Sequence, residues 1–297
     1  MQLTLSSAFY EYLCYGFLYF TVISLWLPRI YQRQSWPFFF MISLLFGLIS
    51  HTIEWIALIP ISLLAIAVSG FINTKNALLH TIAGLLIILI SIGLAMHLFP
   101  GFHNLMVIDH VLINQDAIPY SMGLNFDKTV VGIFILGILT QRITTFQEWL
   151  AVIKHIKLST PFIILGLIVI ALLMRFVYFE PKISNYLPLW CLTNLLFVCT
   201  AEEAFFRGFI QKQLTAATTR FKNGHYYAIL VASILFGLAH YAGGIKYVIL
   251  ATIAGIGYGW VYDRTKRIEA SIITHFGLNL THFIFFTYPM LVSATSG

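Results

Sequence analysis

The chain alternates between long apolar runs and short polar breaks. Most runs approach the roughly 20 residues that one membrane-spanning helix needs. This pattern predicts an all-α, polytopic integral membrane protein with about eight to ten transmembrane helices. The runs cover residues 8–28, 37–53, 55–72, 77–99, 128–141, 160–179, 186–211, 226–242, 245–262 and 268–288.

Two of these regions fit more than one arrangement. The block 37–72 fits either a tight helical hairpin that turns near Glu54 or one long helix. The run 128–141 is short for a full span, which also fits a re-entrant segment.

Composition agrees with the pattern. Of the 297 residues, 9% are charged and 59% are hydrophobic, whereas soluble domains carry roughly 25% charged residues. A soluble fold of this size could not cover its surface with so few charges. The net charge of +6 is not gathered into a basic nucleic-acid-binding motif, so the expected partner is the lipid bilayer rather than nucleic acid. The composition gives no oligomeric state.

The distribution of Lys and Arg predicts the orientation. Cytoplasmic loops are enriched in these residues, and alternating the runs from an outside N-terminus gives a strong bias. The chain is therefore expected to be multi-pass with both termini outside. The inner loops then hold Arg29, Arg33, Lys75, Arg142, Lys154, Lys157, Lys212, Arg220, Lys222, Arg264, Lys266 and Arg267, and the outer loops hold Lys128, Lys182 and Lys246.

One polar segment, residues 100–127, is unusually long. It contains two histidines and three aspartates, but their spacing does not repeat as metal ligands do, which favours an ordinary folded loop over a metal site. Its apolar residues indicate that it lies on the membrane surface or covers a cavity. The histidines and aspartates are His103, His110, Asp109, Asp116 and Asp127.

Ionisable side chains gather inside the last apolar runs, where they are costly and therefore candidates for function. Each of three runs contributes part of the set. The residues are Glu202, Glu203, Arg207, His240, His275 and Asn279.

Helical spacing suggests a role for each carboxylate. Glu203 and Arg207 are four residues apart and can pair on one helix face. Glu202 is turned by about 100° and is left as the uncompensated carboxylate, which suits a general base. A structural Glu–Arg pair is an alternative for Glu203 and Arg207, but it leaves the second glutamate unexplained.

The remaining residues complete a site for water activation. His275 and Asn279 share a helix face, and His240 comes from a different helix that can meet them in a cavity of the bundle. Glu202 with His240 would polarise a water molecule, while His275 and Asn279 would donate to an oxyanion. The expected target is an amide or ester carbonyl.

These residues resemble the CPBP family, the CAAX-protease and bacteriocin-processing intramembrane proteases also called ABI or Rce1-like. The family pattern is Glu-Glu-x-x-x-Arg, Phe-x-x-x-His and His-x-x-x-Asn or Asp. Here it is matched in order by Glu202 to Arg207, Phe236 to His240 and His275 to Asn279. The resemblance covers roughly residues 160–290 and implies an all-helical intramembrane endopeptidase core there. Residues 1–159 form an N-terminal transmembrane region without an assigned role.

The resemblance also implies the catalytic roles. Glu202 and His240 would activate water, His275 and Asn279 would stabilise the oxyanion, and Glu203 and Arg207 would support them. A zinc site of Glu202, His240 and His275 is the alternative. No HExxH helix is present and Arg207 disfavours a cation nearby, so the glutamate mechanism without a cofactor is favoured, with zinc kept open.

The expected function is hydrolysis of a peptide bond in a membrane-associated protein or peptide. The main rival is a non-catalytic partner-binding or bacteriocin-immunity protein that retains the motifs. A proton-coupled transporter in which Glu202 carries protons is the third possibility. The family favours the bacterial inner, or plasma, membrane as the location.

Overall fold

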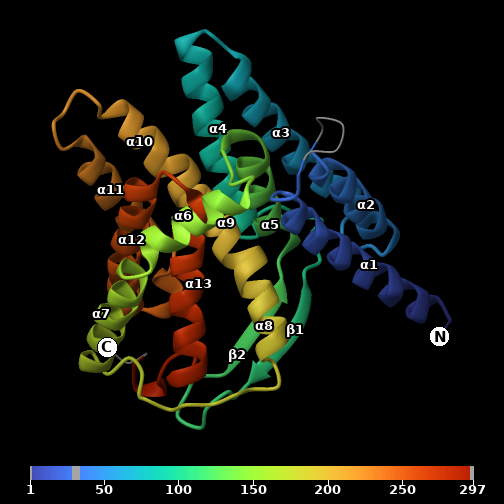
Figure 1. The fold of residues 1–297 in the computed structure, drawn as a ribbon. Helices are drawn as coiled ribbons and strands as arrows, with labels where there is room; N and C mark the ends of the chain where they lie inside the picture. The colour runs from blue at the N-terminus through green and yellow to red at the C-terminus, as the bar shows by residue number, and fades with distance from the viewer. Residues whose placement is uncertain (1, 29–33, 295–297) are drawn as a thin grey trace. The chain divides into compact units, whose positions relative to one another are not determined.

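The computed structural model describes residues 2–28 and 34–294, and these residues are mainly helical (Figure 1). Arg29 and Arg33, which the charge count places in the first inner loop, lie outside the described residues. Four helices of the described chain are long and apolar enough to cross a membrane, or five if one bent pair forms a single span. These spans and the helical content confirm an all-α polytopic membrane protein.

The expected count of eight to ten spans includes helices that fall short of this length. Trp36–Ile49 and Gly224–Leu238 are apolar but shorter. By length and composition alone, the described residues therefore support four or five spans. The qualifying helical segments are Trp55–Asn73, Ala77–Ala95, Leu187–Ala217 and Ile245–Thr265, and the bent pair is Phe146–Ile156 with Ser159–Leu173.

The chain divides into two compact units, which are described separately. The first contains residues 1–106, 123–144 and 196–205, and the second contains 107–122, 145–195 and 206–297. The helices of the first unit are α1 (Gln2–Ser24), α2 (Trp36–Ile49), α3 (Leu58–Asn73), α4 (Ala77–Ala95), α5 (Phe126–Phe134) and α9 (Thr200–Glu203), with the π-helical turn η2 (Ile135–Leu139) after α5.

Helices α1 and α2 pack side by side in the first unit (Figure 1). The Ser43 hydroxyl donates to the carbonyl oxygen of Cys14 at 2.7 Å, and the Phe46 ring stacks against Tyr10 and Phe17. After α2 the chain turns through Ser50–Glu54 before α3 begins, so residues 37–72 form two separate helices rather than one long helix.

A glycine sets the approach of α5 to α9. A Cβ atom added at Gly132 would lie 2.8 Å from the Cα atom of Ala201. The two backbones therefore meet at a distance that only glycine permits. This contact fixes the register between the first turn of α5 and the two glutamates that follow Ala201.

The second unit is built around α12 and α13. The helix α12 packs against α11, α13 and α7, and α13 also packs against α7 and α6. The helices are α6 (Phe146–Ile156), α7 (Ser159–Leu173), α8 (Leu187–Thr193), α10 (Lys212–Ala217), α11 (Gly224–Leu238), α12 (Ile245–Thr265) and α13 (Ile268–Phe285).

The run Leu187–Ala217 is helical throughout but not α-helical throughout. Two stretches, Asn194–Cys199 (η3) and Ala204–Gln211 (η4), are π-helical and flank the short α9. Such turns are rare and occur often at functional sites. The rotation of about 100° per residue, which places Glu203 and Arg207 on one face, belongs to a regular α-helix and therefore does not apply through η4.

The long segment 100–127 contains the strands β1 (Leu105–Val111) and β2 (Tyr120–Leu124), which pair in a two-stranded sheet. Within the second unit, Ile108 and Met122 of these strands pack against Trp190 of α8 and Phe283 of α13. The segment is thus a folded element rather than an irregular loop. The sequence prediction missed its strands.

Candidate functional site

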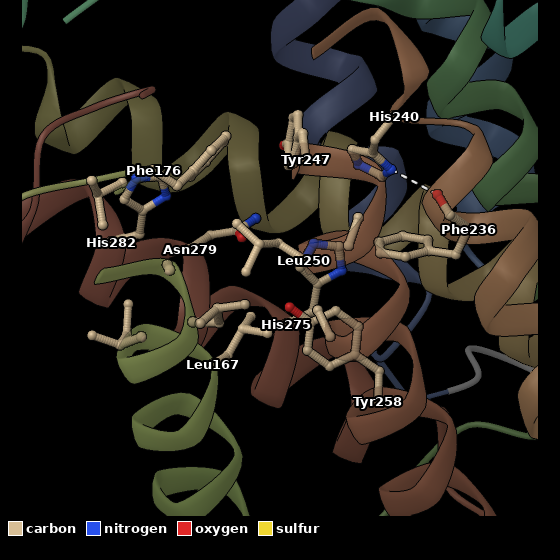
Figure 2. Close-up of a pocket in the computed structure, with 16 residues that line it drawn as sticks. Leu167, Phe176, Phe236, His240, Tyr247, Leu250, Tyr258, His275, Asn279 and His282 are labelled. Carbon is tan, nitrogen blue, oxygen red and sulfur yellow. Dashed lines mark hydrogen bonds between the residues drawn. The ribbon is translucent and has the colours of Figure 1, made fainter. Parts of the chain in front are cut away.

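One cavity of the second unit brings together three of the expected site residues. His240, His275 and Asn279 line a cavity of about 90 Å³ (Figure 2). His240 follows the end of α11, whereas the other two residues belong to α13. Apolar side chains from α7 and α12, including Leu167 and Leu250, form much of the remaining wall. The cavity is therefore mostly apolar, with polar groups at a few points.

A backbone contact fixes the tautomer of His240. Its Nδ1 atom lies 2.7 Å from the carbonyl oxygen of Phe236, one helical turn earlier (Figure 2). A carbonyl oxygen only accepts, so Nδ1 carries the hydrogen and donates it. The neutral ring then holds a lone pair on Nε2, which can accept a proton or a hydrogen bond. The Phe-x-x-x-His spacing itself produces this arrangement.

His275 is held between aromatic rings. It stacks on Tyr258 with ring centroids 4.6 Å apart and meets Phe236 edge to face at 5.7 Å. The residue is 4% exposed. Figure 2 shows His275 beside Tyr258, with both residues at the wall of the cavity. The stacking fixes the ring plane, as a positioned hydrogen-bond donor requires.

Asn279 lies one turn beyond His275 on α13, and its amide is held by a hydrogen bond. Its Nδ2 donates to Oδ1 of Asn194 at 3.1 Å. Asn194 begins the π-helical stretch η3 and is buried. The π-helical stretch thus supplies a partner that orients one of the expected site residues.

Arg207 lies behind the aromatic wall of the cavity. Its guanidinium carbon is 4.5 Å from the centroid of Phe236 and 5.3 Å from that of Tyr258, and Nη2 donates to the carbonyl oxygen of Gly255 at 3.1 Å. The side chain is fully buried. Its charge is therefore stabilised by ring faces and a backbone carbonyl, and it supports the rings that hold His275.

The glycines of α12 contact different partners on two sides of the helix. Gly255 and Gly259 accept hydrogen bonds from Arg207 and Gln211, which are also four residues apart. Gly257 instead faces Ile163 of α7. The glycines at the contact with Arg207 and Gln211 are therefore Gly255 and Gly259, whereas Gly257 lies on another side of α12.

Glu202 and Glu203 belong to the first unit. The Glu202 side chain is 12% exposed, and its Oε1 atom accepts from Nζ of Lys128 at 2.6 Å. The expectation that Glu202 is the uncompensated carboxylate is thus wrong, because the Lys128 ammonium balances its charge. Glu203 is fully buried. No spacing rule links positions 128 and 202, and the charge count had placed Lys128 in an outer loop.

A second polar cluster precedes Lys128 at the start of α5. Asp127 is 1% exposed and accepts from Nδ1 of His97 at 2.6 Å, from Nδ2 of Asn104 at 3.0 Å and from the backbone N–H of Lys128 at 2.9 Å. These bonds fix the first turn of α5, which carries Lys128. The cluster therefore positions the cation that contacts Glu202.

The hydrogen bond to Asp127 raises the pKa of His97 above 6.5, although burial acts against it. The histidine is then more readily protonated in the folded state, so its contribution to stability is present below pH 6.5 and is lost as the pH rises through the folded-state pKa. When the pH is raised from 6 to 8.5, we expect the free energy of unfolding of the wild type to decrease relative to that of His97→Asn. The decrease should be less than about 1 kcal/mol, because the histidine is half exposed.

Thermal unfolding of both proteins in one detergent at the two pH values measures this difference. Asparagine tolerates the positive φ of +57° at this position, which removes the imidazole without adding backbone strain. Equal pH dependence in the two proteins would contradict a stabilising role for the His97–Asp127 pair.

The cavity contains further residues that the sequence did not single out. Tyr247, Tyr258 and His282 all line it. The Nε2 atom of His282 lies 3.1 Å from the carbonyl oxygen of Thr287, to which it donates. His282 lies one turn beyond Asn279, and that spacing is the signal that could have placed it with the cavity. Tyr258 gave no comparable signal, because a tyrosine in an apolar helix is common.

The metal alternative can be tested against the residues present. Within the described residues, no group of three or more His, Cys, Asp or Glu side chains is arranged to hold a metal ion. The Arg207 guanidinium adjoins the rings that wall the cavity, and a fixed cation there opposes a second one. The glutamate mechanism without a cofactor and the zinc set of Glu202, His240 and His275 both stay predictions.

The segment that holds all six expected site residues is similar to known proteins. Residues 184–281 match the family described as type II CAAX prenyl endopeptidase Rce1-like. A Bacillus subtilis (strain 168) protein named "Putative membrane peptidase YdiL" is 31% identical over 92 residues. That match covers 31% of this chain and 35% of the Bacillus protein, so the chain spans about a third of its relative. No solved structure matches the chain significantly.

Proposed function

We propose that this chain, whose residues 184–281 match the Rce1-like family, belongs to the CPBP family and is an intramembrane endopeptidase. Its substrate is a membrane-associated protein or peptide, and its protease core is assigned to residues 160–290. The family match and the name of the Bacillus subtilis relative support a membrane protease at the family level. The observation that carries the proposal is the convergence of His240, His275 and Asn279 on one cavity within the matched segment.

The proposed reaction is the attack of water on a peptide carbonyl. Glu202 and His240 take the proton of the water molecule, and the lone pair that the Phe236 contact leaves on Nε2 suits His240 to this role. His275 and Asn279 donate to the oxyanion that forms on the carbonyl oxygen. When the C–N bond then breaks, the proton taken from the water passes to the departing amine, which yields a carboxylic acid and an amine. Glu203 and Arg207 act as supporting groups. Arg207 supports the cavity wall and Lys128 balances the charge of Glu202.

The reaction is proposed to be of the glutamate type. The Arg207 charge beside the cavity wall favours it over a zinc-assisted one, since a bound cation would be repelled. The bacterial plasma membrane is the proposed location, supported by the bacterial relative. The Lys and Arg distribution supports outside positions for both termini.

Glu202→Gln is expected to abolish cleavage while leaving the protein in the membrane, because glutamine keeps the shape of the side chain but cannot take a proton. The measurement is quantitative proteomics of native membranes that contain either wild type or the variant. Polypeptides that accumulate uncut with Glu202→Gln are the substrates. Glu54→Gln removes an exposed carboxylate that pairs with His103 in the first unit, and it serves as the matched control.

Two other outcomes would change the proposal. A wild-type sample treated with a zinc chelator tests the mechanism, because accumulation of the same uncut polypeptides would establish a metal requirement. Identical peptide patterns for wild type and Glu202→Gln, with a preserved cellular phenotype, would show a non-catalytic binding or immunity protein instead.

A further inference from the structure

The helix α6 has an exposed apolar face. Phe146, Leu150 and Ile153 follow one another at helical spacing and are 72%, 50% and 50% exposed. Val152 and Ile156 are buried on the neighbouring side of the helix, where α6 packs against α12 and α13. A short amphipathic helix with these features lies in the membrane interface rather than across the bilayer. We therefore place α6 at the boundary between lipid headgroups and acyl chains.

A groove lies where α6 meets α7 and α12. The chain bends by 44° between α6 and α7, and two cavities open at this corner. One has a volume of about 360 Å³ and is lined by polar residues, including His155, Ser159 and Arg264. The other has a volume of about 580 Å³ and is lined mainly by apolar residues. Both cavities share Ser159 and Trp260, so they form one groove with a polar end and an apolar end.

The polar end carries a cation that faces outward. The Arg264 guanidinium lies over the Trp260 ring at 5.7 Å, and within the described part of the chain it makes no hydrogen bond or ion pair. The nearby carboxylate of Glu148 is bound to Arg267 at 2.6 Å. Asp263 is bound to Lys266. The acidic groups near this end thus have their own partners, and the groove keeps an excess positive charge.

A histidine and a hydroxyl also line this end. Nδ1 of His155 lies 2.7 Å from the carbonyl oxygen of Ala151 and donates to it, so the ring is held at the edge of the groove. The Ser159 hydroxyl lies 3.4 Å from the carbonyl oxygen of Ile156 and can turn toward a better acceptor. His155 in this tautomer has no second N–H to donate, so the phosphate-binding groups at this end are the arginine and the hydroxyl.

The apolar end fits a hydrocarbon chain. Phe162 is 77% exposed and Ile256 is 40% exposed, and both line the groove. Trp260 stands between the two ends, the position that its amphipathic ring takes at a membrane interface. We propose that this groove binds an anionic phospholipid, with its phosphate at Arg264 and one acyl chain along Phe162, Ile256 and Trp260.

The first test measures lipid binding by the full-length protein in phosphatidylcholine-containing micelles. Added dioleoylphosphatidylglycerol should raise the midpoint of thermal unfolding in a saturable way, as a ligand specific for the folded state does. Arg264→Gln should weaken the apparent affinity by about 10- to 100-fold, the size expected when a hydrogen-bonded charge pair is lost. Arg264→Lys should keep most of the affinity, and Lys222→Gln, which removes an exposed cation outside the groove, should keep all of it.

A second variant and two other ligands make the result decisive. Ile256→Trp fills the apolar end while leaving Arg264 in place, so it should weaken lipid binding even if Arg264→Gln does not fold. Inorganic phosphate and added dioleoylphosphatidylcholine should each leave the midpoint unchanged. An equal shift with inorganic phosphate would show a site for a free anion, and unchanged affinity in both groove variants would place the lipid elsewhere; either result overturns the proposal.

Discussion

Replacement of His240 by alanine is expected to lower kcat for peptide cleavage by about 10²- to 10⁴-fold, the range of a general acid–base group. The hydrogen bond from Nδ1 to the Phe236 carbonyl fixes both the tautomer and the direction of the ring. Alanine removes the imidazole ring, and with it the basic Nε2 atom, from the cavity lining. The measurement is single-turnover cleavage, in proteoliposomes, of a polypeptide identified by its accumulation with Glu202→Gln.

A histidine of the same cavity provides the matched control. His282 lines the cavity, but its Nε2 hydrogen is donated to the Thr287 carbonyl, which ties the end of α13 to the chain beyond it. His282→Gln should therefore change kcat by less than about 10-fold, below the range of an acid–base group. Equal losses in both variants would mean that each histidine only maintains the shape of the cavity.

Spacing along the sequence was informative where one helix carries the chemistry. His275 and Asn279 are four residues apart on a regular α-helix, and both line the cavity as that spacing suggests. The Phe-x-x-x-His motif likewise produces a local contact, the bond from His240 to the Phe236 carbonyl. Local hydrogen-bond geometry depends on neighbours in the chain, so a single sequence contains it.

Contacts between segments that are distant in the sequence could not be predicted from residue spacing. Lys128 meets Glu202 because Gly132 lets α5 approach α9 closely, and neither charge nor hydropathy contains that information. Lys128 lies at the edge of an apolar run, and a hydropathy pattern assigns such a cation to a loop. The expectation of an uncompensated Glu202 was wrong because it considered only charges on the same helix.

Two local features were also missed, for different reasons. The π-helical stretches η3 and η4 depend on tertiary packing, and their apolar composition does not differ from that of an α-helix. The strands β1 and β2 had a weak signal, since residues 105–111 are rich in Val and Ile, which favour strands. In a chain dominated by membrane helices, that signal was interpreted as an apolar surface loop.

Gly237→Ala is expected to destabilise the protein by about 1–3 kcal/mol, the usual effect of overpacking. A Cβ atom added at Gly237 would lie 2.7 Å from the carbonyl oxygen of Val248 and would also clash with the Thr252 side chain. Thr252 cannot easily turn away, because its hydroxyl donates to that same carbonyl at 2.8 Å. Helices α11 and α12 must therefore separate beside Phe236, and the unfolding midpoint should fall.

Gly166→Ala is the matched control. It makes the same chemical change within the interior of α7, where an added Cβ atom meets nothing within 4 Å. That substitution should raise stability by about 0.5–1 kcal/mol, because alanine favours the helix more than glycine does. Thermal unfolding of both variants in one detergent compares them directly. Gly237 lies beside Phe236, which lines the cavity together with Tyr258, so the rate of cleavage should fall with Gly237→Ala and not with Gly166→Ala. Equal unfolding midpoints and equal cleavage rates in the two variants would show that close contact between α11 and α12 is not required.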